Sequence, residues 1–101
     1  MKEVEDIVLL IKMGESVQMP RREVFSHFPV LRVIKVVKDG IPIGTEFFPG
    51  AQSVPSTRHP KTIRLVNLNW NSVDVRVMYD STSKQVSLVS GNVDSVSIRV
   101  I

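Results

Sequence analysis

The sequence predicts a mainly β (α+β) protein. It would have short N-terminal helical segments, then an antiparallel β-hairpin and a four-stranded meander that form a small sandwich or open barrel. Valine occurs eighteen times, and β-branched side chains suit a pleated sheet. Apolar and polar residues alternate over much of residues 63–101. Because 101 residues are too few to divide between two cores, we expect one domain over residues 1–101.

The first element has two interpretations. A helical stripe with an acidic first turn, followed by Gly14 where a C-terminal cap would stand, favours a helix. The stripe consists of Val4, Ile7, Val8 and Ile11. The competing interpretation is a strand over residues 7–13 that turns at Gly14-Glu15 into residues 16–19. We expect the helix.

A second short helix is predicted over residues 20–29, because proline is tolerated in a first helical turn and both phenylalanines would face the core. Residues 30–37 then form a strand that is apolar on both faces, which indicates cover on both sides. Asp39-Gly40 suits a type I′ turn into a returning strand over residues 41–48. Pro42 places that returning strand at an edge or a bulge.

The C-terminal meander is predicted from parity, because residues paired across strands share a face. The alternation changes phase after Trp70, so a two-residue turn at Asn71-Ser72 would pair Trp70 with Val73; a β-bulge is the alternative. An even-length turn over residues 80–83 would place Val77 opposite Val86. An odd-length loop containing Gly91 would let the last strand join the same apolar face and finish the sheet.

Composition excludes several classes of function. The chain has no cysteine, which removes disulfides, thiolate catalysis and cysteine metal ligands. Its longest apolar run, residues 7–11, is far shorter than the roughly 20 residues that span a bilayer, so we expect no membrane association. The acidic start at Met1 does not resemble a secretory signal. We expect Met1 to be the mature start, and a location in the cytoplasm or within an assembled particle.

Residues that could carry catalysis are few. His27 and His59 are the only histidines, and neither stands in a catalytic or metal-binding signature. Asp39, Asp80 and Asp94 fall in predicted turns, where aspartate bonds to nearby backbone. We therefore expect no enzyme activity, no metal, no cofactor and no small-molecule substrate, and a small hydrolase using either histidine is the least favoured function.

The informative feature is the placement of charge. Residues 47–61 form one long irregular, proline-rich connection, and connections of this kind often carry function. No carboxylate occurs between Glu46 and Asp74. The loop and the following strand are therefore locally basic and fit an acidic partner or phosphates. The residues assigned to binding in this region are Phe47, Phe48, Arg58, His59, Lys61 and Arg64.

The chain ends on an apolar strand containing Arg99 and Ile101. Either this strand is an edge that pairs with another chain or it completes the core of a monomer. We expect a non-enzymatic protein-binding or assembly module, such as a small subunit of a virion or other particle, docking through residues 47–61 and the terminal strand. The alternative is a nucleic-acid-binding module using residues 58–64, although parity assigns Trp70 and Tyr79 to the core and not to base stacking.

Overall fold

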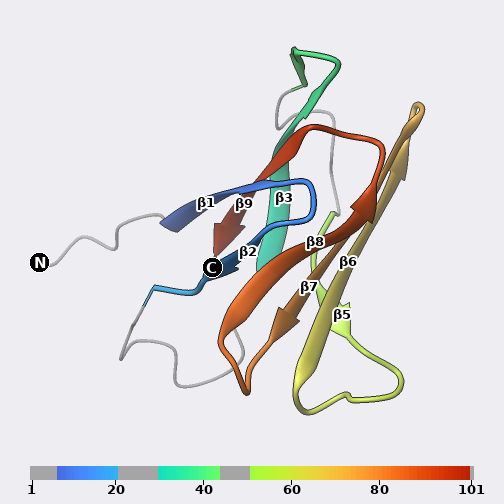
Figure 1. The fold of residues 1–101 in the computed structure, drawn as a ribbon. Helices are drawn as coiled ribbons and strands as arrows, with labels where there is room; N and C mark the ends of the chain where they lie inside the picture. Colours follow the sequence, from blue (N-terminus) through green and yellow to red (C-terminus); the bar gives the residue numbers. More distant parts are fainter. Residues whose placement is uncertain (1–6, 21–29, 44–50, 101) are drawn as a thin grey trace, which may run out of the picture.

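The computed structural model describes residues 7–20, 30–43 and 51–100, and these residues are mainly β, arranged in two antiparallel sheets. Sheet A contains β1 (Ile7–Lys12), β9 (Ser95–Val100), β3 (Leu31–Lys38) and β4 (Ile41–Ile43), in that order. Sheet B contains β2 (Ser16–Gln18), β8 (Gln85–Gly91), β7 (Val73–Asp80), β6 (Ile63–Trp70) and β5 (Val54–Pro55), in that order. Figure 1 shows β9 running between β1 and β3.

The two sheets enclose one apolar core, to which the long strands contribute alternate residues. Val36, Val96 and Ile98 of sheet A are fully buried, as are Val66, Val77 and Val86 of sheet B. Because the core lies between sheets, each long strand presents its other face to the outside. The fold is a β-sandwich, in agreement with the mainly β prediction.

Chain segments join the sheets along both sides of the sandwich. On one side, β1 turns directly into β2 through Met13–Glu15, and the Glu15 carbonyl accepts a bond from the Leu88 N–H at 3.2 Å. On the other side, residues 51–53 lie along β3: the Ser53 N–H donates to the Leu31 carbonyl at 2.8 Å. The same segment then continues as β5, which pairs with β6. Part of the connection expected to be irregular over residues 47–61 is thus hydrogen-bonded to both sheets.

The β6–β7 hairpin confirms the parity prediction. Trp70 lies opposite Val73, and Leu68 lies opposite Val75. Asn71 and Ser72 have φ of 46° and 68°, the left-handed pair that a type I′ turn requires. The two-residue turn, and not the bulge, explains the change of phase in the sequence.

The Asp39-Gly40 turn is also confirmed, with φ of 53° and 77°. β3, however, is not covered equally on both sides as the sequence indicated. A bulge lies between Val33 and Lys35, so the strand changes phase: Leu31, Val33 and Val36 are all buried in the core. The extra residue therefore explains why Val36 is buried on the same face as Leu31 and Val33, although it has the opposite parity in the sequence. Pro42 lies in the edge strand β4, as expected.

The first predicted helix is wrong over the residues that the structure describes, because Ile7–Lys12 is strand β1. The run Ile7–Ile11 is apolar at every position, so it fits the period of a helix and the period of a strand equally well. Antiparallel pairing with β9 selects the strand, in which Leu9 and Ile11 are buried. Gly14, with φ of 79°, serves the β1–β2 turn and not a helix cap. The helix expected over residues 20–29 lies almost entirely outside the described residues.

The four-stranded meander is wrong in its last step. β6, β7 and β8 are consecutive neighbours, but β9 leaves for sheet A. Parity identified its buried residues correctly, since Val96, Ile98 and Val100 lie in the core. The apolar face of β9 would be buried equally well beside β8 in sheet B or in sheet A across the core. Parity therefore could not identify which strand β9 pairs with. Within the meander, Val77 lies opposite Leu88 and not Val86, a shift of two residues that preserves the face.

Gly91 ends β8 in close contact with the backbone of β7, and it provides a stability test. A Cβ atom on Gly91 would lie 2.9 Å from the Asp74 carbonyl oxygen. Because that atom is backbone in a paired strand, Gly91→Ala should lower the free energy of unfolding by about 1–3 kcal/mol, measured by urea denaturation. Gly14→Asn is the control, because its Cβ would meet nothing within 4 Å and asparagine tolerates positive φ. Equal stabilities for the two variants would contradict this packing.

Candidate interaction surfaces

The structure places the predicted binding residues in three different situations. Phe47, Phe48 and Ile101 lie outside the described residues. Arg58, His59 and Lys61 are exposed on the loop between β5 and β6, whereas Arg64 and Arg99 lie within strands and are partly buried. The predicted set is therefore spread over both sheets and one loop.

The β5–β6 loop is held by a local hydrogen-bond network. The buried Ser56 hydroxyl accepts bonds from the backbone N–H groups of Arg58 and His59, at 3.2 and 3.3 Å. The Ile63 N–H donates to the His59 carbonyl at 2.9 Å, which closes the loop at its far end. The three basic side chains project from a fixed backbone into solvent, and their assignment to binding stays a prediction.

Arg64 does not share the outward direction of that loop. It pairs with Tyr79 across β6 and β7, so the two side chains lie on the same side of sheet B. That side is the inner one, because Val66 and Val77 lie two residues further along the same strands, on the same face, and are fully buried. Residues 58–64 thus do not form one continuous basic surface.

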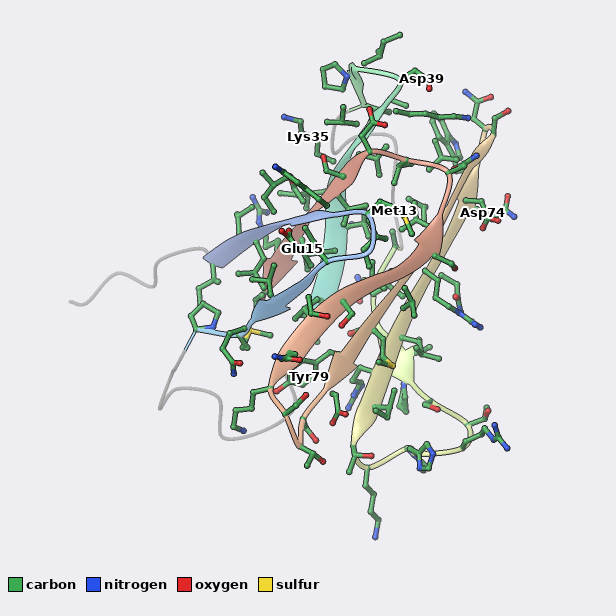
Figure 2. The ribbon with its side chains drawn as sticks, in the orientation of Figure 1. Met13, Glu15, Lys35, Asp39, Asp74 and Tyr79 are labelled. Atoms are coloured by element: carbon green, nitrogen blue, oxygen red, sulfur yellow. The ribbon has the colours of Figure 1, made fainter. Side chains whose placement is uncertain are left out.

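Tyr79 is a core residue, as parity predicted, with 4% of its surface exposed. Figure 2 shows it on β7, towards the end of the sandwich that carries the β7–β8 turn. Burial raises the pKa of the Tyr79 phenol above its ordinary value of 10.0, and the neighbouring Asp80 carboxylate raises this pKa further. Trp70 is only partly buried but packs against the same core.

The predicted bonding of turn aspartates to nearby backbone is confirmed at Asp80, whereas Asp94 bonds to a turn that is distant in the sequence. The Asp80 carboxylate accepts a bond from the Thr82 N–H at 2.8 Å within the β7–β8 turn. The Asp94 carboxylate accepts a bond from the Gly40 N–H at 2.9 Å. Asp94 thereby ties the loop before β9 to the β3–β4 turn.

The terminal strand is not an open edge. β9 pairs with β1 along all six of its residues and with β3 on its other side. Its backbone is therefore occupied by the chain's own strands, and the expectation that it recruits another chain by edge pairing is wrong. Its outward side chains, including Arg99, remain on the outer face of sheet A.

Four described strands stand at sheet edges, and three of them carry features that discourage pairing. β2 and β4 are three residues long, and β5 is two residues long. Pro42 in β4 and Pro55 in β5 have no backbone N–H to donate to an added strand. β1 differs: it has six residues, no proline and no bulge against β9.

β1 also presents apolar side chains to the outside. Val8 and Leu10 alternate with the buried Leu9 and Ile11, and they are 50% and 57% exposed. Met13 follows in the β1–β2 turn, where Figure 2 labels it, and is 41% exposed. Sequence analysis missed this surface because it assigned the same residues to a helix.

The outer face of sheet A carries four cations on β1, β3 and β9, which we call the basic face: Lys12, Arg32, Lys35 and Arg99. Arg32 lies opposite Arg99, while Lys35 and Lys12 lie opposite Ser97 and Ser95 respectively. Figure 2 shows Lys35 on β3. Only Arg99 was identified from the sequence. The other three are scattered along the chain, and the strand order that brings them together was not predicted.

The part of the chain that the structure describes contains no group of three or more His, Asp or Glu side chains placed to hold a metal ion. It also contains no helix long and apolar enough to cross a membrane. Of the two histidines, His59 is exposed on its loop and His27 lies outside the described residues. Comparison of the chain with protein-family models, curated proteins and solved structures gives no match.

The burial of Tyr79 predicts a loss of stability at high pH. The raised pKa means that the folded state favours the neutral phenol. The stabilisation is complete below the unfolded-state pKa of about 10 and is lost as the pH rises through the folded-state value. Urea midpoints measured from about pH 8 to 11 should therefore fall further for the wild type than for Tyr79→Phe.

The chain has a single tyrosine, so phenolate absorbance reports on Tyr79 alone. Both proteins share the titration of the lysines, which makes the variant a matched control. Parallel pH profiles, together with a tyrosine that titrates at its ordinary pKa in the folded protein, would contradict the buried placement.

Proposed function

We propose that this chain is a non-enzymatic assembly module that associates with a second copy of itself through the outer edge of β1. The observation that carries the proposal is the contrast among the described sheet edges. Three are short or contain proline, whereas β1 is six residues long and exposes Val8 and Leu10. Unblocked apolar edges of this kind are templates for strand addition.

The sequence of β1 favours a second copy as the partner. In an antiparallel pair of β1 strands centred on Leu9, Val8 of one copy lies opposite Leu10 of the other. Ile7 lies opposite Ile11 on the inner face. Every one of these cross-strand pairs is apolar. The two copies of Lys12 stand at opposite ends of the pair, so they do not repel one another.

Such pairing would join two four-stranded sheets into one continuous eight-stranded sheet, because β1 is the terminal strand of sheet A. Apolar cross-strand pairs contribute roughly 0.2–1 kcal/mol each, and association costs at least about 4 kcal/mol of lost freedom. With backbone bonds of about 1 kcal/mol each added, the balance favours a weak dimer. We therefore expect a dissociation constant between about 10 μM and 1 mM.

Sedimentation over about 1 μM to 1 mM protein tests this function. The weight-average mass should rise from the monomer value of 11.3 kDa towards twice that value. The double variant Val8→Lys, Leu10→Lys should remain monomeric, because it places cations at the paired edge. Val89→Lys, Val54→Lys is the matched control, since these residues are 48% and 55% exposed but lie on β8 and β5.

A monomer at every concentration would refute self-assembly, as would equal dissociation of both double variants. The register has its own test, since the chain has no native cysteine. A mixture of Val8→Cys and Leu10→Cys proteins should form the mixed disulfide readily, because directly opposite residues lie within disulfide reach. Val8→Cys alone should cross-link slowly. The opposite preference would exclude a pair centred on Leu9.

A further inference from the structure

Exposed cations from two connections gather at one end of the sandwich, where Figure 1 shows the β5–β6 loop and the β7–β8 turn. The Ser81 N–H of the turn donates to the Thr62 carbonyl of the loop at 2.9 Å, which joins the two connections. Four exposed side chains on them, which we call the basic end, are Arg58, His59, Lys61 and Lys84. Lys84 was not identified from the sequence. In the structure it takes the place that the prediction gave to the partly buried Arg64.

Negative charge lies mainly elsewhere in the described structure. Figure 2 shows Asp39 and Asp74 at the opposite end of the sandwich from the β7–β8 turn. Asp80, at the end of β7, is the carboxylate next to the basic end, and it accepts a bond from the Thr82 N–H at 2.8 Å. Residues 51–73 contain no aspartate or glutamate. Among the described residues, one neighbouring carboxylate therefore offsets the positive charge of the basic end only in part.

We propose that the basic end binds the phosphate backbone of duplex nucleic acid. This function is separate from self-assembly, because none of the four residues lies on β1. The loop backbone is fixed before a ligand arrives, since the buried Ser56 hydroxyl accepts bonds from the N–H groups of Arg58 and His59. A preformed site loses less conformational freedom on binding. A small number of charged contacts is therefore enough to give measurable affinity.

Backbone acceptors around the basic end already have partners. The Lys84 carbonyl accepts bonds from the Met19 N–H at 2.7 Å and from Gln18 Nε2 at 3.2 Å. The His59 carbonyl accepts a bond from the Ile63 N–H at 2.9 Å. The lysine and arginine side chains, which only donate, are left exposed to a ligand. Phosphate oxygens match such donors, whereas a peptide also brings backbone N–H groups that need acceptors.

The strand register sets the width of the basic end. Ile63, Asp80 and Gln85 form one row across β6, β7 and β8, and neighbouring strands lie about 5 Å apart. Lys61 and Lys84 come just before the outer two members of this row, so their backbones are roughly 10 Å apart. One strand of duplex DNA carries a phosphate about every 3.4 Å of helix axis. The basic end therefore spans about three phosphates, which matches its lysine and arginine side chains.

Fluorescence anisotropy of a labelled DNA duplex of about 20 base pairs tests the proposal, with the protein titrated from about 1 to 100 μM at low salt. The triple variant Arg58→Gln, Lys61→Gln, Lys84→Gln should weaken binding at least tenfold. Wild-type affinity should fall with salt at a logarithmic slope of about −3, and the slope of this variant should be near zero. The variant should keep wild-type self-association in sedimentation, because its substitutions lie away from β1.

The matched control is Lys12→Gln, Arg32→Gln, Lys35→Gln, which removes one arginine and two lysines from sheet A. Its affinity for the duplex should change less than threefold, and its salt slope should stay at the wild-type value. Equal weakening in the two triple variants would overturn the proposal, because it would show a response to net charge and not to the basic end.

Lysine footprinting on the wild-type protein keeps the test independent of any effect of the substitutions on folding. The duplex should protect Lys61 and Lys84 from acetylation and leave Lys12 and Lys35 reactive. Absence of binding at low salt would overturn the proposal, as would protection of Lys12 and Lys35 instead. Equal affinity for polyglutamate of the same charge would overturn the assignment to phosphate and indicate an acidic protein partner. None of these outcomes bears on self-assembly, which has its own variants.

Discussion

The structure depends on the burial of β9 in the middle of sheet A. Its inward side chains Val96 and Ile98 are fully buried, and its backbone pairs with β1 on one side and β3 on the other. In the described structure, β1 has no other strand partner in sheet A. Without β9, β1 would lose its strand pairing in sheet A, and the core would lose the buried side chains of β9. The last strand in the chain therefore organises the first.

The same constraint creates the apolar edge at β1 and the basic face. Pairing with β9 turns Leu9 and Ile11 inward, which necessarily turns Val8 and Leu10 outward along an edge. It also sets Arg99 beside Arg32 and completes the basic face. Because the apolar edge and the basic face adjoin on one side of sheet A, a β1-paired dimer would present two basic faces on one continuous sheet.

Local features of the fold could be predicted from the sequence, and long-range features could not. The β6–β7 hairpin was predicted to the residue, because a tight turn fixes the register of its own strands. The position of β9 was missed because its buried face is equally satisfied in either sheet. The uniformly apolar run Ile7–Ile11 has no period of its own, so only its tertiary partner decides that it is a strand. The basic face was missed for a related reason: Lys12 and Arg99 are far apart in sequence, and only β9 joins them.

Site-resolved amide hydrogen exchange is the most direct measurement of this account, because it reports on β9 and β1 together. The account predicts slow exchange throughout β9, where both edges are paired. In dilute protein, alternate amides of β1 should exchange rapidly from its open edge and become protected as the concentration rises. Rapid exchange in β9, or alternate β1 amides that are protected equally at every concentration, would contradict it.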